Sequence, residues 1–310
     1  MKKVLIAGGA GFLGSYLTEI MLERGYELTI VDDLSSGLEK NLSEISSKIN
    51  FVQSNIIEFK SEEKFDIIVN LASRASRVEW ETFPVEVALT NSLGNDNLLR
   101  LALEGRSLYI YASSSEVYGN PDMIPTPETY VGRVSTIGSR SPYDEGKRFG
   151  EALVKSYQKE YGLRNIIIRF FNTYGPRMRG GDFYGRVVDR FVQQAIRGEP
   201  ITVYGDGKQT RSFTYVTDTV AALLMLILKG NEGEVYNIGN DKEISILDLA
   251  YEVKKVCKSS SEIQFKTIPE DEPMRRAADI KKITELGFTH SISLEEGIKN
   301  MAIFNRRAFS

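Results

Sequence analysis

A tyrosine and a lysine lie four residues apart in the segment SPYDEGKR, residues 141–148, and this pair could carry out proton transfer. At this spacing, Tyr143 and Lys147 would share one face of a helix. A free tyrosine has a pKa of about 10, which is too high for a base at neutral pH. An ammonium group about 4 Å away would stabilise the phenolate by about 4 kcal/mol, or roughly three pKa units. The pair therefore predicts a tyrosine that removes a proton from a hydroxyl group, with the lysine tuning it.

A serine and a glutamate follow the apolar segment Tyr109–Ala112, within the run SSSEVYG. Cofactors usually bind at the carboxyl edge of a parallel sheet, so Ser114 and Glu116 are candidates to lie at such a site. We expect Ser114 to hold a substrate hydroxyl while Tyr143 removes its proton and a hydride leaves the same carbon. The simpler alternative is a tyrosine and a solvated lysine on an ordinary helix surface. The alternating strands and helices around the pair argue against that alternative.

The glycine-rich segment GGAGFLG, residues 8–14, follows an expected strand at Val4–Ala7 and opens an expected helix at Phe12–Arg24. Glycines at this spacing allow a tight turn, the close approach of a pyrophosphate, and close packing of helix on sheet. The helix N-terminus adds unpaired N–H groups and a partial positive charge. The segment predicts a dinucleotide site, with contacts from Gly8, Gly11, Phe12, Leu13 and Gly14.

Acidic residues after the second expected strand, Leu28–Val31, indicate which dinucleotide binds. Asp32 can accept hydrogen bonds from the ribose hydroxyls of adenosine, whereas its charge would repel a 2′-phosphate. NAD is therefore predicted rather than NADP. Asp33 is the rival for this role, or the cap of the following turn. Further cofactor contacts are expected near the third and fourth strands, from Asn55, Ile56, Leu71, Ala72 and Ser73. Tyr143 and Lys147 are expected to contact the cofactor as well, with Lys147 binding its ribose.

Short apolar strands alternate with helical patterns in the first half of the chain, which predicts parallel crossovers. The predicted fold class is α/β, with a Rossmann-type doubly wound parallel sheet and a smaller C-terminal α/β lobe for the substrate. Residues 1–171 are assigned to the NAD-binding domain, and residues 212–240 are expected to return to it. Residues 172–211 and 241–310 are assigned to the substrate lobe.

The composition excludes several classes of protein. The 310 residues include 39 basic and 42 acidic side chains, for a net charge of −3, and no long basic run. Nucleic acids and anionic membranes are therefore not expected as partners. Cys257 is the only cysteine and His290 the only histidine, so neither an internal disulfide nor a Cys/His metal cluster can form, and we expect no metal. The N-terminal apolar run is too short to span a membrane, and a reducing, cytoplasmic setting is expected.

Together these motifs resemble the extended short-chain dehydrogenase/reductase family, through GGAGFLG, Asp32, SSSEVYG, and Tyr143 with Lys147. Within the family, the chain most resembles the UDP-glucuronate decarboxylases, over nearly its whole length. The matching segments are SPYDEGKR, RFFNTYGPRM, GRVVDRFVQQAIRGEPITVYGDGKQTRSFTYVTD and DEPMRRAADIKK. The resemblance implies an NAD-dependent enzyme that acts on a UDP-sugar and forms a homodimer.

The resemblance also implies a reaction and a set of substrate contacts. C4 of UDP-glucuronate would be oxidised, the C6 carboxylate would leave as carbon dioxide, and hydride would return to C4 to give UDP-xylose. Glu116 would manage protons at C5 or favour loss of the carboxylate. Arg276 would meet the sugar end. The implied nucleotide contacts are Asn172, Arg186, Tyr204 and Arg211, with Arg177 as a further candidate. Arginine suits a diphosphate because its planar fork binds oxygens in pairs.

Three segments depart from the decarboxylase pattern. Val131 and Ser135 stand where the family has a tryptophan and an asparagine. The run SRASR, residues 73–77, has arginines in place of prolines, and Asn55 stands where an aspartate is common. Hydride transfer does not depend on these positions. The identity of the sugar does, so a related nucleotide sugar stays open.

Three alternative functions are considered. An NDP-sugar 4-epimerase shares the 4-keto chemistry but has no need of Glu116. A 4,6-dehydratase normally uses an Asp-Glu pair, and this chain has Ser115-Glu116 at that position. The non-enzyme alternative is an NAD-binding regulatory protein, which would keep the glycine segment. Such a protein would have no need of Ser114, Tyr143 and Lys147 together.

Overall fold

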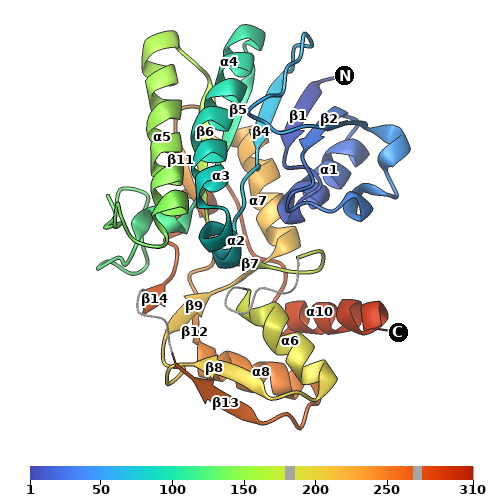
Figure 1. Cartoon of the computed structure of the whole chain (residues 1–310), viewed down its shortest axis with the longest axis vertical. Coiled ribbons are helices and arrows are strands. Elements are labelled where there is room, and N and C mark those ends of the chain that lie inside the picture. Colours follow the sequence, from blue (N-terminus) through green and yellow to red (C-terminus); the bar gives the residue numbers. More distant parts are fainter. Residues whose placement is uncertain (179–185, 268–273, 310) are drawn as a thin grey trace. The chain divides into compact units, whose positions relative to one another are not determined.

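The computed structural model describes residues 1–178, 186–267 and 274–309. The chain forms two compact units, whose helices and strands are shown in Figure 1. The first unit comprises Met1–Val117, Val134–Phe170 and Val220–Tyr236. The second unit comprises Tyr118–Arg133, Phe171–Thr219 and Asn237–Ser310.

The first unit is built on a seven-stranded sheet of order β11-β6-β5-β4-β1-β2-β3. Its strands are β1 (Lys3–Ala7), β2 (Glu27–Asp32), β3 (Asn50–Gln53), β4 (Ile67–Asn70), β5 (Leu108–Ser114), β6 (Asn165–Phe170) and β11 (Val235–Ile238). The pairs from β6 to β3 are all parallel. The central strands are buried apolar runs, as expected where helices cover both faces of a parallel sheet. This order is that of a doubly wound Rossmann fold, and the predicted fold class is confirmed.

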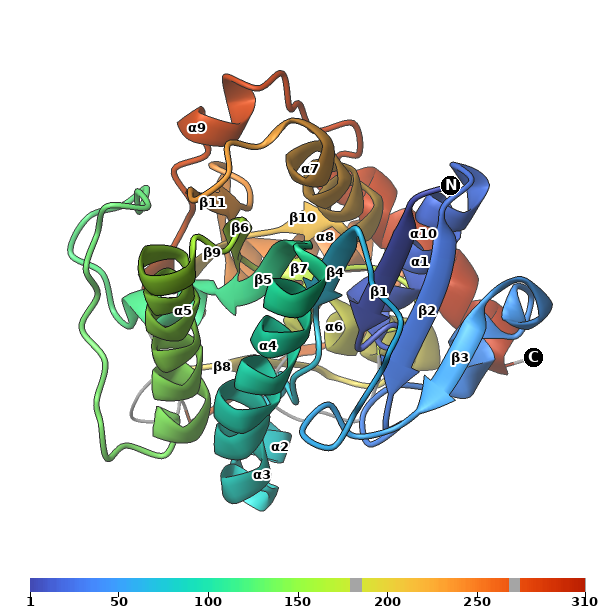
Figure 2. The ribbon, with the colours of Figure 1, turned by 90° about the horizontal axis from the view of Figure 1, so that it is seen from above.

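Helices cover both faces of this sheet. They are α1 (Phe12–Glu23), α2 (Arg77–Thr82), α3 (Pro84–Leu89), α4 (Asn95–Gly105), α5 (Ser141–Tyr161) and α7 (Val216–Lys229). Figure 2 shows α3, α4 and α5 on one face, and α1 and α7 on the other. In α5, a proline stands in the first turn and Gly162, with φ of 71°, ends the helix. Proline is frequent in the first turn of helices and glycine just after their last turn, so the boundaries of α5 are encoded locally.

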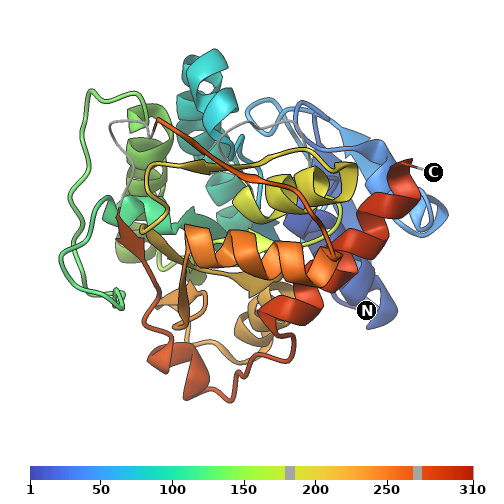
Figure 3. The same cartoon turned by 90° about the horizontal axis from the view of Figure 1, so that it is seen from below.

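The second unit contains short strands and four helices among the residues that the structure describes. The strands are β7 (Thr173–Tyr174), β8 (Ile201–Tyr204), β9 (Thr210–Ser212), β10 (Thr214–Tyr215), β12 (Glu243–Ser245), β13 (Ile263–Lys266) and β14 (Arg275–Arg276). The helices are α6 (Val187–Arg197), α8 (Ile246–Cys257), α9 (Lys281–Thr284) and α10 (Leu294–Phe309). Helices α6, α8 and α10 pack against one another, as Figure 3 shows. Asn305 Nδ2 donates to Asp189 Oδ1 at 3.2 Å and so joins α10 to α6.

The division into units differs from the predicted domain ranges at residues 118–133, 171, 212–219 and 237–240. Thr126 bridges to Ala278, and its N–H donates to Ala277 O at 2.9 Å, so this loop pairs with chain from the C-terminal third. Strand β9 pairs with β12 and β14, and strand β10 pairs with β7. These pairings join segments far apart in the sequence, which local patterns do not reveal.

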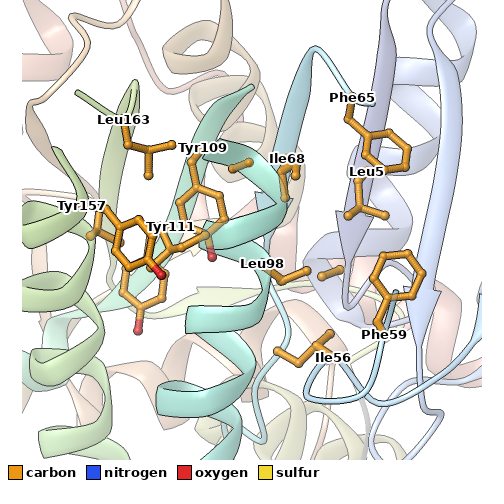
Figure 4. Packing of buried hydrophobic residues seen from close by; sticks show 14 of the residues in the cluster. Leu5, Ile56, Phe59, Phe65, Ile68, Leu98, Tyr109, Tyr111, Tyr157 and Leu163 are labelled. Atoms are coloured by element: carbon orange, nitrogen blue, oxygen red, sulfur yellow. The ribbon is translucent and has the colours of Figure 1, made fainter. Parts of the chain in front are cut away.

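A core of apolar side chains lies between the sheet and helices α4 and α5 (Figure 4). Leu5, Ile68 and Ile167 contribute from the strands, and Leu98 and Val154 contribute from the helices. All five side chains are completely buried. This burial provides the main stabilisation of the sheet that carries the functional residues.

Replacing Leu98 by alanine is expected to lower the free energy of unfolding by about 2–5 kcal/mol, because it removes buried methyl groups and leaves a cavity. Urea denaturation followed by circular dichroism measures the change. The control is Leu228→Ala, on α7, where the side chain is half exposed and the loss should be under about 1 kcal/mol. Equal losses for the two variants would contradict the assignment of Leu98 to the core.

Candidate active site

Strand β5 carries Ser114 to the carboxyl edge of the sheet, where the chain turns into a short 3₁₀ helix, Ser115–Tyr118. The N–H of Glu116 donates to Ser114 Oγ at 3.2 Å, which fixes the serine side chain at the start of this turn. Ser114 also shares a side-chain hydrogen bond with Tyr143. Two hydroxyl groups therefore meet at the end of β5, and both can contact one substrate oxygen.

Tyr143 and Lys147 lie on the face of α5 that packs on the sheet, and both side chains are buried. Lys147 Nζ donates to Ala112 O at 2.7 Å. The same nitrogen is 5.7 Å from the centre of the Tyr143 ring and 5.2 Å from that of Tyr111. The structure thus brings Ser114, Tyr143 and Lys147 together around the last residues of β5.

Burial dominates the protonation of this pair. It raises the pKa of Tyr143 well above its ordinary value, and the hydrogen bond from Ser114 only partly opposes this. Burial also lowers the pKa of Lys147 to about 7, against the opposing charge of Glu151. The expectation that Lys147 by itself brings the pKa of Tyr143 toward neutrality is therefore wrong. That expectation left out the cost of removing the phenolate from water, which is the largest cause of the raised pKa.

Gly8 and Gly11 belong to the turn between β1 and α1, and Gly14 lies in the first turn of α1. Gly8 has φ of 79°, and a Cβ on it would lie 2.8 Å from Ala72 N. A Cβ on Gly14 would lie 2.1 Å from Gly8 O. The turn ends at Gly11, the N-cap of α1, which offers no side-chain cap to the first N–H groups of the helix. A side-chain-free turn leading into a helix N-terminus fits the pyrophosphate of a dinucleotide.

Asp32 and Asp33 have different hydrogen-bond partners after β2. Asp32 is buried and accepts from the N–H groups of Ala10 and Leu34, at 2.9 Å each. Burial raises the pKa of Asp32, and these two bonds oppose the rise. Asp33 is exposed and accepts from Ser35 N–H at 2.9 Å, so it caps the following turn. Asp32 is thus held beside the glycine turn, where a carboxylate can accept from a ribose hydroxyl.

The remaining cofactor candidates line the neighbouring strand ends. Asn55 Nδ2 donates to Asp33 Oδ2 at 3.4 Å, and Ile56 is buried in the core. After β4, Leu71 N–H donates to Ala7 O at 2.9 Å and Ala72 N–H donates to Asn70 Oδ1 at 3.2 Å. Ser73 Oγ is buried without a hydrogen-bond partner among the described residues. An unsatisfied hydroxyl at this edge is consistent with a bound polar group there.

Two further residues of the site, Trp80 and Arg140, were not predicted from the sequence. The Trp80 ring stacks on Tyr143, with centres 4.4 Å apart and 14° between the planes. Arg140 is ion-paired with Glu116, and its Nε lies 3.5 Å from Asp144 Oδ2. Two signals could have indicated them. Trp80 is the only tryptophan of the chain, and Arg140 immediately precedes the segment SPYDEGKR.

The candidate substrate residues all belong to the second unit. Arg211 and Arg276 occupy paired positions of β9 and β14, and both are buried. Arg211 Nη1 donates to Thr210 O at 2.7 Å. Asn172 Nδ2 donates to Ser212 O at 3.1 Å, on the same strand as Arg211. The structure therefore brings Asn172, Arg211 and Arg276 to one small sheet.

The other three candidates lie elsewhere in the second unit. Tyr204 is the last residue of β8. Arg190 Cζ lies 5.0 Å from the centre of the Tyr204 ring, so the guanidinium stacks over this ring. Arg186 is the N-cap of α6, and Arg177 follows β7; both have positive φ. Residues 271–273 of the segment DEPMRRAADIKK lie outside the described residues.

The described parts of the chain contain neither a candidate metal cluster nor a helix able to span a membrane. No group of three or more histidine, cysteine, aspartate or glutamate side chains there could hold a metal ion. Within the same residues, every helix is too short or too polar to cross a membrane. Cys257 is buried, and burial raises the pKa of its thiol.

A doubly wound parallel sheet with a Ser–Tyr–Lys cluster at its carboxyl edge and a glycine turn after β1 defines a Rossmann-type oxidoreductase scaffold. Residues 4–239 match the model of the NAD dependent epimerase/dehydratase family. The chain belongs to this family, within the extended short-chain dehydrogenases/reductases.

Relatives of known function are similar over nearly the whole chain. UDP-glucuronic acid decarboxylase 1 of Arabidopsis thaliana is 43% identical over 302 residues, covering 96% of this chain and 68% of the relative. UDP-glucuronic acid decarboxylase 1 of Xenopus tropicalis is 40% identical over 309 residues, covering 99% of this chain and 72% of the relative.

Solved structures are similar in fold at lower identity. UDP-glucose 4-epimerase of Thermotoga maritima, solved with UDP-glucose, gives a TM-score of 0.92 at 29% identity, covering 99% of this chain and 100% of the other. UDP-glucuronic acid 4-epimerase of Bacillus cereus, solved with NAD, gives a TM-score of 0.87 at 26% identity, covering 99% of this chain and 100% of the other.

Proposed function

We propose that the chain is a UDP-glucuronate decarboxylase that forms UDP-xylose with NAD as its resident cofactor. The observation that carries the proposal is the carboxylate of Glu116 on the turn that positions Ser114, beside Tyr143. A decarboxylation needs a group that manages protons next to the departing carboxylate, whereas exchange of C4 epimers does not. The decarboxylases that are 40–43% identical to this chain support the same reaction.

The cofactor would bind along the carboxyl edge of the first unit. The glycine-rich segment of Gly8, Gly11 and Gly14 would hold its pyrophosphate, and Asp32 would accept from its adenosine ribose. When bound, NAD supplies the hydride acceptor for C4 and a positive ring that favours the phenolate form of Tyr143. Lys147 would hold the second ribose through its ammonium group, next to Tyr143.

The chain's own residues then move protons. Ser114 holds the C4 hydroxyl, and Tyr143 accepts its proton as C4 becomes a ketone. The C6 carboxylate is now a β-keto acid, so the C5–C6 bond breaks, carbon dioxide leaves, and the electron pair is held on the ketone oxygen. Glu116 would manage the proton that C5 gains. Tyr143 returns its proton to the C4 oxygen when C4 is reduced again.

The second unit would supply the contacts to the nucleotide and the sugar. Arg211 and Arg276 place two buried guanidinium groups on neighbouring strands, which is a suitable arrangement for binding anionic oxygens. The family resemblance assigns Arg276 to the sugar and Arg211 to the nucleotide. It adds Asn172, Arg177, Arg186 and Tyr204 as nucleotide contacts.

The experiment that tests this function is incubation of the purified chain and NAD with UDP-glucuronate, UDP-glucose and UDP-N-acetylglucosamine, with products identified by mass and NMR. Carbon dioxide release and UDP-xylose from the first substrate alone are expected. The second candidate is a UDP-sugar 4-epimerase, which the similarity to solved 4-epimerases favours. Formation of a C4 epimer without loss of mass would establish that candidate instead.

A homodimer is proposed through exposed apolar side chains on α3, α5 and the π-helical turn Thr90–Gly94 (η3). Val85, Leu89 and Leu93 follow at intervals of four residues, and Phe149 is exposed on α5, against which α3 packs. An exposed apolar surface of this kind is typical of a protein–protein interface. The family resemblance implies the same assembly.

Replacing Leu93 by glutamate is expected to convert this dimer to a monomer of 34.8 kDa, because a charge would be buried at the interface without a partner. Light scattering coupled to size-exclusion chromatography measures the mass. Leu228→Glu introduces the same charge at an exposed position of α7 and should leave the mass unchanged. A wild-type chain that elutes at the monomer mass would refute the proposed interface.

A further inference from the structure

Arg140 lies at the N-terminal end of α5 and contacts three residues of the candidate active site. Its guanidinium is ion-paired with the Glu116 carboxylate, and its Nε lies 3.5 Å from Asp144 Oδ2. Its Cζ is 5.6 Å from the centre of the Trp80 ring, and that ring stacks on Tyr143. These contacts fix the guanidinium beside the groups that would do the chemistry.

The charges in this cluster are shielded from water. The side chains of Arg140, Glu116 and Asp144 are only 15%, 13% and 6% exposed. Charges in such surroundings are costly unless an opposite charge compensates them. The three groups carry one negative charge in sum when all are ionised, and without Arg140 they would carry two. Arg140 therefore sets the net charge of this part of the site.

A uronate substrate would bring another carboxylate to the same place. Glu116 N–H donates to Ser114 Oγ, and Ser114 is hydrogen-bonded to Tyr143, so Glu116 lies on the turn next to the proposed C4 site. In a hexuronate, the C6 carboxylate is attached to C5, the neighbour of C4. Binding of the C4 hydroxyl at Ser114 thus brings the C6 carboxylate close to Glu116. Like charges at short distance oppose binding unless a cation compensates them.

We propose that Arg140 is the residue that admits an anionic sugar to this site, because it neutralises Glu116. The inference rests on the proposed function, since it takes the C4 hydroxyl to bind at Ser114 and Tyr143. Arg140 acts through Glu116 and is a positioning residue. Its planar fork can meet two carboxylates and stack on an indole at once, which the point charge of a lysine cannot do.

The test is charge-selective binding in a Tyr143→Phe background, in which turnover of the sugar nucleotide is expected to be about 10²- to 10⁴-fold slower than in the wild type. Calorimetry with NAD present measures the Kd of UDP-glucuronate and that of UDP-glucose, which has the same nucleotide and a neutral C6. Arg140→Gln is expected to raise the Kd of UDP-glucuronate by about 100-fold and that of UDP-glucose by less than about threefold. Arg140→Lys is expected to recover about tenfold of the lost affinity. Equal losses for both ligands, or no loss for either, would overturn the proposal.

A double variant separates charge compensation from a structural role. Adding Glu116→Gln to Arg140→Gln removes the carboxylate that Arg140 neutralises. The double variant should therefore bind UDP-glucuronate within about threefold of the Tyr143→Phe parent. It also leaves no unpaired Glu116 charge to destabilise the fold. If the double variant binds UDP-glucuronate as weakly as Arg140→Gln does, Arg140 acts through packing and the proposal is overturned.

A matched control and a separate assay complete the design. Arg164→Gln removes a guanidinium that is ion-paired with Glu232 on the exposed surface of the first unit, and it should not change either Kd. Carbon dioxide release by the wild type tests the proposed function independently. If no carbon dioxide forms but Arg140→Gln still discriminates against the anionic sugar, the reaction is wrong and the role of Arg140 stands. If carbon dioxide forms and discrimination is absent, the reaction stands and the role of Arg140 fails.

Discussion

Replacing Tyr143 by phenylalanine is expected to lower kcat by about 10²- to 10⁴-fold, because the group that accepts and returns the proton of the C4 hydroxyl is removed. The ring itself is retained, so its stacking on Trp80 should persist. The Kd values of NAD and the UDP-sugar should therefore change by less than about threefold, since binding uses other groups. Turnover is measured by NMR of the product, and binding by calorimetry.

The matched control is Tyr157→Phe, on the same helix. The Tyr157 hydroxyl donates to Asp96 Oδ1 at 2.7 Å, and both residues lie outside the candidate site. Loss of this bond should cost about 1 kcal/mol of stability and leave kcat unchanged. Full turnover by Tyr143→Phe would remove the tyrosine from the mechanism. A loss of turnover in Tyr157→Phe as large as in Tyr143→Phe would trace the effect to helix α5 as a whole.

Replacing Gly14 by alanine is expected to weaken NAD binding by at least about 100-fold, and turnover should fall with it. The added Cβ would lie 2.1 Å from Gly8 O and 2.7 Å from Gly9 Cα. Both are backbone atoms of the turn that would hold the pyrophosphate, so the turn itself must move. Fluorescence titration with NAD measures the affinity, and thermal unfolding measures the accompanying loss of stability.

Gly25→Ala is the control for this substitution. Gly25 has a conformation that favours glycine, with φ of 79°, but a Cβ there meets no atom within 4 Å. We expect this variant to lose about 1 kcal/mol of stability and to bind NAD as the wild type does. Wild-type NAD affinity in Gly14→Ala would mean that the turn after β1 does not hold the cofactor.

Features that depend on neighbouring residues were predictable from the sequence. Helix α5 begins at Ser141 and ends before Gly162, and α1 begins after the glycine turn, because proline, glycine and apolar spacing act within a few residues. The doubly wound sheet followed from the alternation of strands and helices. The helical run of residues 84–105 contains a π-helical turn, Thr90–Gly94 (η3), between α3 and α4. There Asn91 Nδ2 donates to Val87 O at 2.9 Å, and a Cβ on Gly146 would meet Asn91 Cβ at 3.1 Å.

Interactions between distant segments were not predictable. Trp80 stacks on Tyr143 across 63 residues of sequence, and Arg140 pairs with Glu116 across 24 residues. The pairing of Arg276 with Arg211 depends on the register of two short strands. Neither composition nor periodicity reveals which loops meet in space.

The scaffold and the residue types of the chemistry were predictable from the sequence: a glycine turn for phosphate, an acid for ribose, and Tyr143 four residues before Lys147 on one helix face. The pKa shifts of that pair, in contrast, depend on the tertiary structure. Burial raises the pKa of Tyr143 and lowers that of Lys147, and burial is a property of the whole packed unit. The structure also decided that Glu116 meets Arg140, because that contact requires the end of β5 and the start of α5 to lie together.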